Sequence, residues 1–360
     1  MRILVVGGGI AGLTTATVLG RLGHHVLVAE RTPDFAAVGA GIGLAAGPEA
    51  VLDALGIDRA GVGEPIHRLE VRDAGGRVLQ AVAAGGPRAY ARPDLHRALL
   101  AAAREVADLR GSSVPDADQR AAHDLVVGAD GISSATRAAV VGPVGVRYSG
   151  ATCWRAIVPN VGVDASFEAW GDGVRVGGIP LTDGRLYCFL VRTCPRRSAG
   201  PADLATLQRW MAGIGGEAGD VVAALAALPP FHHDLDELDR PVWGDGATVL
   251  VGDAAHAVTP NLGFGAGLAI EDAAALGLLL ADGCPAGGAA RALRRSRHRR
   301  VRRVQLVSRR IGQAAQVRSA LGGRARDALA AATPAVVLRR KQTALDAPGH
   351  RLAARLRAVL

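Results

Sequence analysis

Arg2-Ile-Leu-Val-Val-Gly-Gly-Gly-Ile-Ala-Gly12 is the stretch that decides the fold. Its apolar first half, rich in β-branched residues, predicts a buried parallel strand that ends at Val6. The glycines at positions 7, 9 and 12 predict a tight turn, followed by a helix to about Leu22 that packs closely on the strand. A second strand over Val26–Ala29 ends at Glu30. This order of strand, turn, helix, strand and acid predicts a dinucleotide-binding unit, in which N–H groups at the helix start face a pyrophosphate.

Two further motifs rich in glycine and aspartate follow the first. The second, Gly128-Ala-Asp-Gly131, comes directly after the apolar run Asp124–Val127. The third, Gly252-Asp-Ala-Ala-His256, comes directly after the apolar run Thr248–Val251. Loops so far apart in the chain meet on one dinucleotide only if the fold brings them together. Taken singly, the aspartates of these two motifs have an alternative role as helix N-caps.

Length and composition favour a soluble enzyme with two lobes. The chain has 360 residues, whereas single cores stop growing at about 250–300 residues. Hydrophobic residues make up 49% of it, but there is no apolar run of about 18 residues, so no membrane span is expected. Because a core strand begins at once, we expect no signal peptide and a cytoplasmic location. The four cysteines lack metal-binding spacing and are expected to be free thiols.

Arginine is concentrated in one segment of this basic chain. The net charge is +9, Lys341 is the only lysine, and ten of the 20 residues from 291 to 310 are arginine. One interpretation is a patch that binds nucleic acid or an acidic membrane. We favour a solvated helix face, because apolar residues recur among the arginines and no aromatic residue is interleaved for base stacking. Those apolar residues are Leu293, Val301, Val304, Leu306, Val307 and Ile311. We therefore expect neither nucleic acid nor a membrane as a partner.

The succession of patterns predicts an α/β protein with a discontinuous first domain. Residues 1–150 and 246–285 are expected to form a Rossmann-like domain with a parallel sheet, including a helix over Pro93–Val106. Residues 151–245 are expected to form a substrate domain built on an antiparallel sheet, with helical residues at 202–227. Long helices are expected in the C-terminal region, residues 286–360.

The three motifs in this order resemble the FAD-dependent aromatic hydroxylases of the para-hydroxybenzoate hydroxylase fold. The resemblance rests on the N-terminal glycines, on Asp124–Ser134 with Arg137, and on Gly252–His256 with Pro260. Within that fold, the salicylate-hydroxylase-like branch is the most similar. Shorter matches extend the resemblance over nearly the whole chain, and they are Arg92-Pro-Asp-Leu-His96, Tyr148-Ser-Gly150, Trp154-Arg155, Glu271-Asp-Ala273, Arg297 and Ser308-Arg309.

The resemblance implies that FAD is bound by residues from all three motifs. Within this set, Glu30 would contact the adenosine ribose and Asp253 the ribityl chain. The glycine-rich turn after Pro260 would direct N–H groups at the flavin, which suits the negative charge of a reduced flavin. The implied cofactor-binding residues are Gly9, Ala11, Gly12, Glu30, Arg31, Arg92, Val114, Asp130, Asp253, Pro260, Gly263, Gly265, Ala266 and Gly267.

The resemblance further implies a monooxygenase. NADH or NADPH would reduce FAD after binding transiently, because the chain has no second nucleotide-binding unit of this type. A flavin hydroperoxide formed with O2 would then hydroxylate a small aromatic substrate, phenolic or polycyclic, held between the lobes. Candidate substrate contacts are Arg155, Arg192 and His233. A histidine of the 232–233 pair would serve as the base for a phenol, although such pairs more commonly lie at the surface or a strand edge.

Some residues of the pattern are expected to be structural or depart from the family. His256 is expected to be structural, and no residue is assigned as catalytic. Only residues 107–123 stand where the family has a small β-meander beside the adenine. Leu109–Val114 is predicted as its first strand, and Pro115–Ala122 is too short and polar for two more. Phe264 replaces a polar residue and would either narrow the pocket over the flavin or match an apolar substrate.

Other activities on the same fold remain alternatives. They are an epoxidase, a flavin reductase and a catalytically inert flavin-binding protein. A halogenase is not expected, because the chain has no Trp-x-Trp motif and Lys341 lies too close to the C-terminus to serve as the catalytic lysine.

Overall fold

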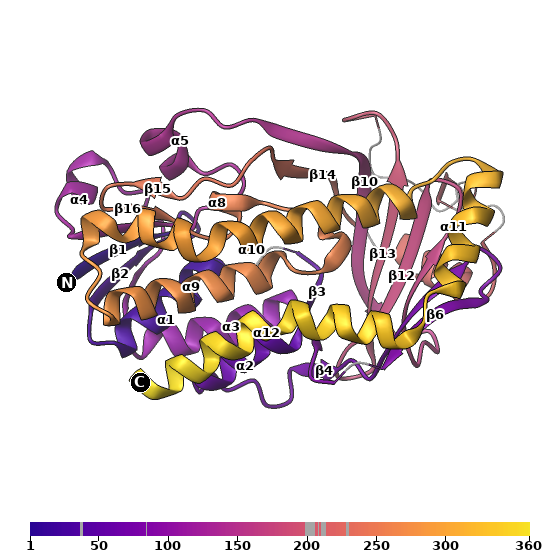
Figure 1. Ribbon diagram of the computed structural model, residues 1–360, viewed down its shortest axis with the longest axis horizontal. Coiled ribbons are helices and arrows are strands. Elements are labelled where there is room, and N and C mark those ends of the chain that lie inside the picture. Colours follow the sequence, from indigo (N-terminus) through magenta and orange to yellow (C-terminus); the bar gives the residue numbers. More distant parts are fainter. Residues whose placement is uncertain (37–38, 84, 199–205, 208, 210–213, 228–229) are drawn as a thin grey trace.

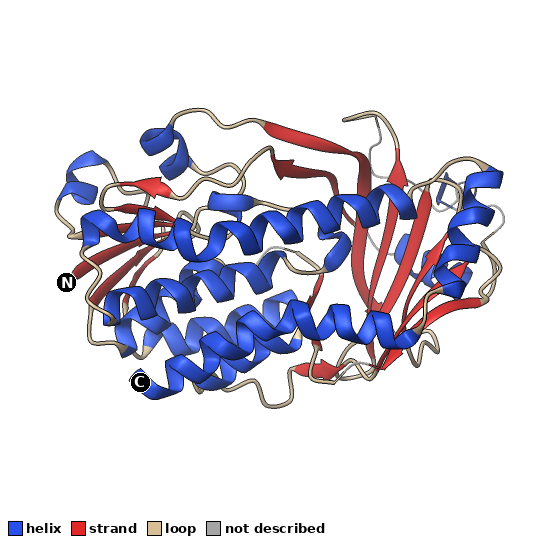
Figure 2. Ribbon diagram, viewed as in Figure 1, coloured by secondary structure: helices blue, strands red, loops and turns tan. Residues whose placement is uncertain are grey.

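The protein is described here by a computed structural model. It describes residues 1–36, 39–83, 85–198, 206–207, 209, 214–227 and 230–360. The molecule is elongated, with a parallel sheet at the end that holds the N-terminus and a larger sheet toward the other end (Figures 1 and 2). Long helices run along its length between the two. No helix in the described ranges has the length and apolar character needed to cross a membrane.

The sheet at the N-terminal end confirms the strands predicted from the three motifs. Its strand order is β15-β16-β9-β1-β2-β8, and every pair is parallel except β15 with β16. The strands that precede the three glycine motifs, β1, β9 and β16, are neighbours, so the motifs lie together at one edge of the sheet. The bounds are β1 Arg2–Val6, β2 His25–Ala29, β8 Asp108–Arg110, β9 Leu125–Gly128, β15 Gly244–Asp245 and β16 Thr248–Leu250.

Helices cover this sheet and bury the main core. Helix α1 packs against α3 and α9, and the C-terminal helix α12 packs against α2 and α9. Leucines at helical spacing, such as Leu95 and Leu99 on α3, are fully buried because they form the apolar faces of these helices. The bounds are α1 Ile10–Arg21, α2 Ala46–Ala54, α3 Arg92–Arg104, α5 Ala135–Val141, α8 Asp253–His256, α9 Gly265–Ala281, α10 Ala286–Ala315 and α12 Ala335–Val359.

The larger sheet has seven strands in the order β14-β10-β13-β12-β11-β5-β6. It is antiparallel as predicted, except that β11 and β5 pair in parallel. One face packs against α7 (Glu217–Ala226) around Trp154 and Phe167. The bounds are β5 Arg68–Asp73, β6 Val78–Ala83, β10 Val146–Pro159, β11 Ser166–Trp170, β12 Val174–Pro180, β13 Arg185–Thr193 and β14 Phe231–Leu238.

Membership of the larger sheet differs from the expected division of the chain. Strands β5 and β6 belong to it, although residues 68–83 lie inside the stretch expected to form the first domain. Strand β5 pairs with β11, which is far away in the sequence, and β6 pairs with β5, so no local pattern indicates that these two strands join this sheet. The domain boundaries themselves remain a prediction. Within the helical stretch expected at 202–227, α7 is described, together with helical residues at 206–207 and 209, and the remaining positions up to 213 lie outside the described residues.

A small third sheet connects the two large ones. It has the order β3-β7-β4, with β3 at Gly41–Leu44, β4 at Gly63–Pro65 and β7 at Arg88–Ala91. Gly41 lies directly against Tyr187 of β13, where a Cβ atom would come within 2.2 Å of the tyrosine ring. A glycine is therefore required at this position for β3 to approach the larger sheet so closely.

Two expectations about the remaining segments need correction. Residues 107–123 contain only the short strand β8, which joins the parallel sheet, and the helix α4 (Ala117–Ala121), so the predicted strand over Leu109–Val114 was too long. In the arginine-rich helix α10, Leu293, Val301 and Val304 are buried as predicted, but Leu306 is exposed. Its position in the helical repeat places it among the arginines of the outer face.

Candidate active site

The first motif forms a tight turn with an open side. Gly7 has φ +109°, and a Cβ atom there would lie 2.5 Å from the carbonyl oxygen of Ala129 in the second motif. A Cβ atom on Gly12 would lie 1.8 Å from the Gly7 carbonyl oxygen. No atom comes within 4 Å of a Cβ atom built on Gly9, which is the N-cap of α1. The chain is therefore packed on one side of this loop and open at the helix N-terminus, as a bound pyrophosphate requires.

Glu30 is oriented toward this loop by hydrogen bonds. The Gly8 N–H donates to its carboxylate at 2.7 Å, and the Thr32 N–H and hydroxyl donate to the other oxygen at 2.9 Å. Although burial raises the pKa of Glu30, these hydrogen bonds bring it below the ordinary value, so the side chain is an anion. The oxygen that accepts only the Gly8 N–H retains acceptor capacity, which fits a hydroxyl group of a ribose. Beside it, Arg31 and Val114 are exposed.

A histidine on α3 also supports the first motif. His96 is buried, and its Nε2 lies 2.7 Å from the Gly8 carbonyl oxygen. Burial lowers the pKa of His96, so the neutral ring donates its Nε2–H to that carbonyl. The helix start Arg92–His96 is thereby fixed to the glycine loop. The sequence places His96 at the end of the Arg92–His96 motif, but it did not indicate this contact with the glycine loop.

The second motif is tied to its own helix and to the third motif. Asp130 accepts hydrogen bonds from the Ser134 hydroxyl and from the Thr136 N–H at 2.9 Å, at the start of α5. The N-cap of α5 is Ser134, which accepts a hydrogen bond from the Arg137 N–H at 2.8 Å, so Asp130 supports the first turn of this helix without being its N-cap. Arg137 is buried and donates to the Ala254 carbonyl at 3.0 Å. The second motif therefore orients the third.

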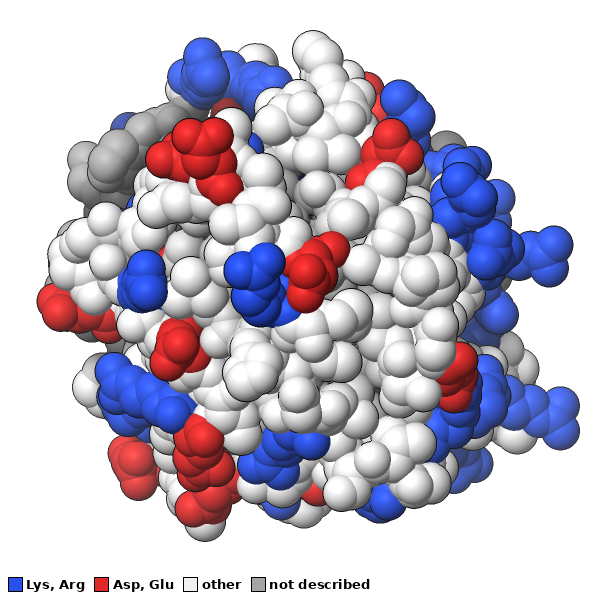
Figure 3. All heavy atoms as spheres, turned by 90° about the vertical axis from the view of Figure 1, so that its left-hand side faces the viewer, with Lys and Arg blue, Asp and Glu red and all other residues white. Residues whose placement is uncertain are grey.

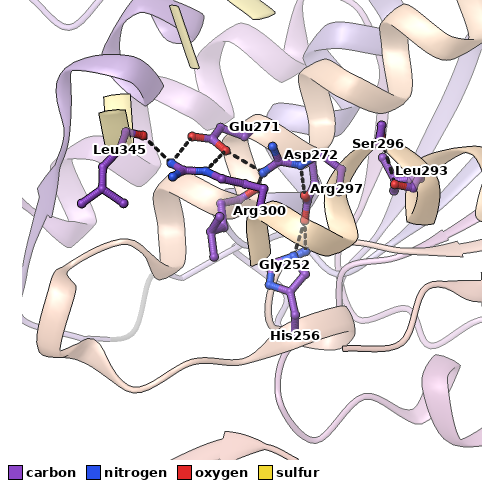
Figure 4. A network of polar contacts seen from close by, with 10 residues as sticks. Gly252, His256, Glu271, Asp272, Leu293, Ser296, Arg297, Arg300 and Leu345 are labelled. Carbon is purple, nitrogen blue, oxygen red and sulfur yellow. Dashed lines mark hydrogen bonds and ion pairs between the residues drawn. The ribbon is translucent and has the colours of Figure 1, made fainter. Parts of the chain in front are cut away.

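A buried charge network holds the third motif (Figure 4). Asp272 on α9 accepts a hydrogen bond from the Gly252 N–H at 3.1 Å and is also paired with His256. Arg297 on α10 donates to Asp272 at 2.8 Å and to Glu271 at 2.7 Å. Burial alone would raise the pKa of Asp272, but His256 and Arg297 hold it below its ordinary value. His256 therefore has a structural partner, in agreement with its expected role.

The network continues to the C-terminal helix. Arg300 donates to Glu271 at 2.9 Å and to the Leu345 carbonyl of α12 at 2.6 Å. Its guanidinium also lies 5.2 Å from the centre of the Phe264 ring, and Phe264 is buried in the main core. Phe264 therefore packs against the helices, and the expectation that it narrows the pocket over the flavin or matches an apolar substrate stays a prediction.

In the sequence, Asp253 lies between Gly252 and His256, the two residues of the third motif that contact Asp272. It is exposed to solvent, yet the surrounding protein raises the pKa of its carboxyl, while His256 and Arg92 act to lower it. No cap bond from its side chain holds α8. A carboxylate that is both accessible and closely surrounded fits a hydroxyl-rich ligand that enters from solvent. Arg92, whose own pKa is lowered by burial, approaches Asp253 from α3.

The glycine-rich turn after Pro260 leads into α9. Gly263 has φ +66°, and no atom lies within 4 Å of a Cβ atom built there. Gly265, Ala266 and Gly267 are the first three residues of α9, so their N–H groups have no acceptor within the helix. Such a helix start suits the electron-rich edge of a flavin.

One face of the larger sheet is directed at this region. Arg155 and Phe189 are paired across β10 and β13, and Tyr187 is paired with Ile157 two residues along, so all four lie on the same face. Tyr187 touches Gly41, which shows that this face is turned toward β3 of the small third sheet. The Nη2 of Arg155 lies 3.0 Å from the Nε2 of His233 on β14. Arg92 lies close enough to Arg155 for each charge to affect the other.

The candidate substrate contacts do not all lie together. Arg192 is paired with Thr152 and Val174, on the opposite face from Arg155 and His233. His232 is on that opposite face too, stacked on Trp154 and 2.9 Å from the Thr152 hydroxyl. The structure thus brings together Arg155 and His233 and adds Tyr187, which sequence reasoning missed. The spacing of Tyr187 and Phe189 by two residues indicates that they share a face of the strand. Only the register of β13 against β10 shows that this is the face of Arg155.

Comparison with known proteins identifies the family. A family model described as an FAD binding domain matches residues 237–310, and one described as an NAD(P)-binding Rossmann-like domain matches residues 5–46. Over 344 residues the chain is 30% identical to the FAD-dependent urate hydroxylase of Klebsiella oxytoca, which covers 86% of this chain and 89% of the relative. The chain belongs to the FAD-dependent aromatic monooxygenases.

Other comparisons agree with this assignment. The monooxygenase is 35% identical over 305 residues to the 2-heptyl-3-hydroxy-4(1H)-quinolone synthase of Pseudomonas aeruginosa, covering 76% of this chain and 79% of that protein. Its fold is that of HpxO from Klebsiella pneumoniae, solved with FAD and uric acid, with a TM-score of 0.85 at 23% identity over 97% of each chain. The enzyme therefore uses FAD, with NADH or NADPH as co-substrate, as its family does.

Proposed function

We propose that this monooxygenase hydroxylates a small, electron-rich aromatic compound with an ionisable oxygen, and that Arg155 binds this oxygen. The observation that carries the proposal is the Nε atom of Arg155, which is buried and has no hydrogen-bond partner among the described residues. A buried N–H without an acceptor is costly, typically about 1–3 kcal/mol and more for a charged group. A substrate oxygen at this position would satisfy it.

The charges around Arg155 favour an anionic form of the substrate. Arg92 and Arg155 are close to one another, and the Tyr187 hydroxyl lies beside Arg155. The guanidinium groups of Arg92 and Arg155, beside this face of the sheet, would lower the pKa of a phenol that binds between them. A phenolate is more electron-rich than the phenol and reacts more readily with an electrophilic oxygen. Arg155 would therefore both orient the substrate and activate it.

His233 supports Arg155 and is not suited to act as the base, which was one of the roles that the sequence left open for the 232–233 pair. Burial and the neighbouring Arg155 lower the pKa of His233 to about 4, so the ring is neutral near pH 7. Its Nε2 lone pair accepts the hydrogen bond from Arg155, so the remaining proton is on Nδ1. A base this weak removes few protons from a phenol at neutral pH. We infer that His233 is a positioning residue.

FAD would be held by the residues of the three motifs. Gly9, Ala11 and Gly12 would bind the pyrophosphate at the start of α1, and Glu30 would bind the adenosine ribose, beside Arg31 and the 110–114 segment. Arg92 and Asp253 would bind the ribityl chain, and Asp130 would orient the second motif. When bound, the flavin supplies the redox chemistry that activates O2 after reduction by NADH or NADPH. The N–H groups of Gly263, Gly265, Ala266 and Gly267, after Pro260, would stabilise negative charge on the ring.

The named relatives agree with an oxygen-bearing, ring-containing substrate. One is named for a hydroxyquinolone and another for urate. We further propose a cytoplasmic location, which the free thiols of the four cysteines support, because cytoplasmic proteins keep thiols reduced. Figure 3 shows the end of the molecule that holds the N-terminus. Basic side chains gather along one margin of this end, and its middle carries both basic and acidic side chains.

The test compares Arg155→Met with Arg192→Met during oxidation of a panel of hydroxylated heteroaromatic compounds. Loss of a charge-assisted hydrogen bond of about 1.5–3 kcal/mol raises KM about 10- to 150-fold. Only Arg155→Met should show this loss, because Arg192 lies on the other face of the sheet. The product should contain one oxygen atom from labelled O2. Equal KM values for the two variants, or a product without the label, would refute the proposal.

A further inference from the structure

Helix α11 (Ala320–Ala332) has its apolar side turned away from the protein. Its buried residues are Gly323 and Ala330, and the half-buried Arg326 and Asp327 lie on the same side of the helix. The opposite side carries Leu321, Ala325, Ala328, Leu329 and Ala332, all of which are exposed. Leu321 is 80% exposed and Leu329 is 72% exposed. A surface helix of a globular protein normally has the reverse arrangement.

The contacts on the inner side explain why the helix keeps this orientation. Arg326 forms an ion pair with Asp327 at 2.7 Å, and its guanidinium lies 5.4 Å from the centre of the Trp170 ring. The Gln80 side chain donates to the Ala330 carbonyl at 2.9 Å. These polar contacts fix α11 against β6 and the end of β11, so its apolar side remains in solvent.

The start of α12 extends this apolar surface. Val336 and Val337, which follow α11 after a two-residue connection, are exposed as well. We call Leu321, Leu329, Val336 and Val337, with the exposed alanines of α11, the α11 apolar face. It lies at the end of the molecule opposite to the N-terminus (Figure 1). Contiguous exposed apolar side chains of this kind mark an interaction site.

Exposed basic residues accompany this face on α11 itself, just before it and in the first turns of α12. The exposed cations are Arg318, Arg324, Arg339, Arg340 and Lys341. Between residues 317 and 345 the only acid is Asp327, and its charge is paired with Arg326. Two copies of the chain that met through this face would bring two sets of cations together. The α11 apolar face is therefore better complemented by a surface with an apolar interior and a negatively charged boundary than by a second copy of the chain.

We propose that the α11 apolar face binds an anionic lipid surface, with α11 lying in the plane of the interface. Apolar side chains on one side of a helix and basic residues around it are the features of interfacial helices. Each basic residue near an anionic bilayer strengthens binding about five-fold. The contact is peripheral, so it needs no membrane-spanning helix. It revises the expectation that a membrane is not a partner.

The experiment measures co-sedimentation of the FAD-loaded enzyme with vesicles of phosphatidylglycerol mixed with phosphatidylcholine, and with vesicles of phosphatidylcholine alone. We expect binding to the anionic vesicles, with at least about tenfold weaker binding to the neutral ones and at 1 M salt. Leu321→Gln/Leu329→Gln should weaken binding by at least about tenfold. Both leucines project into solvent, so the melting temperature and the NAD(P)H oxidation rate without vesicles should not change.

A matched variant separates this face from general basicity. Arg295→Gln/Arg299→Gln/Arg303→Gln removes three exposed arginines from α10, and Arg324→Gln/Arg339→Gln/Arg340→Gln removes three beside the apolar face. The second triple variant should lose more binding than the first. Equal losses, no binding to anionic vesicles, or binding unchanged by the leucine substitutions would overturn the proposal. A dimer that dissociates in Leu321→Gln/Leu329→Gln, without vesicle binding, would assign the face to a second copy instead.

Discussion

Replacement of Arg297 by methionine tests the buried network behind the third motif. The Arg297 side chain is 4% exposed and its partners Glu271 and Asp272 are fully buried. Methionine fills a similar volume but leaves two buried carboxylates with fewer compensating charges. Removing one member of a buried ion pair costs about 3–5 kcal/mol. Since folded domains are stable by only about 5–15 kcal/mol, the variant should lose about a fifth or more of its stability.

Urea unfolding followed by tryptophan fluorescence measures this loss, because Trp243 is buried against His256 with ring centres 5.4 Å apart. The control is Arg299→Met, two residues away on the exposed side of α10, which should change stability by less than about 0.5 kcal/mol. Arg297→Lys keeps the charge and should recover part of the difference. FAD should also dissociate more readily from Arg297→Met, because Asp272 holds the residues on both sides of Asp253.

The pH dependence gives a second check on the same variant. The pKa of Asp272 is depressed in the folded protein, so its stabilisation is present above the ordinary carboxyl pKa of 3.8 and is lost as the pH falls through the folded value. The stability difference between Arg297→Met and the unmodified enzyme should therefore narrow below pH 3.8. If Arg297→Met and Arg299→Met unfold at the same urea concentration, the argument that this network stabilises the fold is refuted.

Three further predictions concern the cofactor and substrate regions. Gly9→Ala should fold like the control Gly287→Ala yet bind FAD at least about tenfold more weakly, because its methyl group enters the open space at the start of α1; unchanged FAD affinity would contradict this. Gly12→Ala should fail to fold or melt far lower, since its Cβ atom would meet the Gly7 carbonyl oxygen at 1.8 Å, and a normal melting temperature would show that the turn relaxes. Burial lowers the pKa of His233 to about 4 and raises that of Tyr187 to about 12, so neither group titrates between pH 6 and 9. The pH profile of kcat/KM should therefore keep its shape over this range in His233→Gln and in Tyr187→Phe. If a titration step disappears in either variant, the replaced residue is the base.

The parts of the fold that local patterns control could be predicted from the sequence. The strands before the three glycine motifs are short runs of β-branched residues ended by glycine, so each can be identified without knowledge of its partners. Their convergence followed from motif order. In contrast, the position of the β5–β6 pair depends on the pairing of β5 with β11, nearly 100 residues further along the chain, and no property of residues 68–83 indicates it.

The candidate site was predictable to the same extent. The motif glycines and aspartates could be proposed as site residues because tight turns and helix starts require these residue types at fixed spacings. Arg155 and Arg192 could not be separated, because only the register of β10 against β13 places them on opposite faces. The burial of Arg297 left a weak signal, since it lies four residues before Val301 and seven before Val304, on the same side of α10.

The position of β16 beside β9 has a consequence for how this protein is made. The two strands are neighbours in the parallel sheet, but 120 residues of chain separate Gly128 from Thr248. During synthesis at about 5–20 residues per second, the edge of β9 therefore waits about 6–24 s for its partner. Helix α12, which packs against α2, is synthesised after β16. Truncated chains that lack β16 or α12 would present an uncovered strand edge or core, so they should be substrates for chaperones and proteases, whereas chains that contain both elements should not.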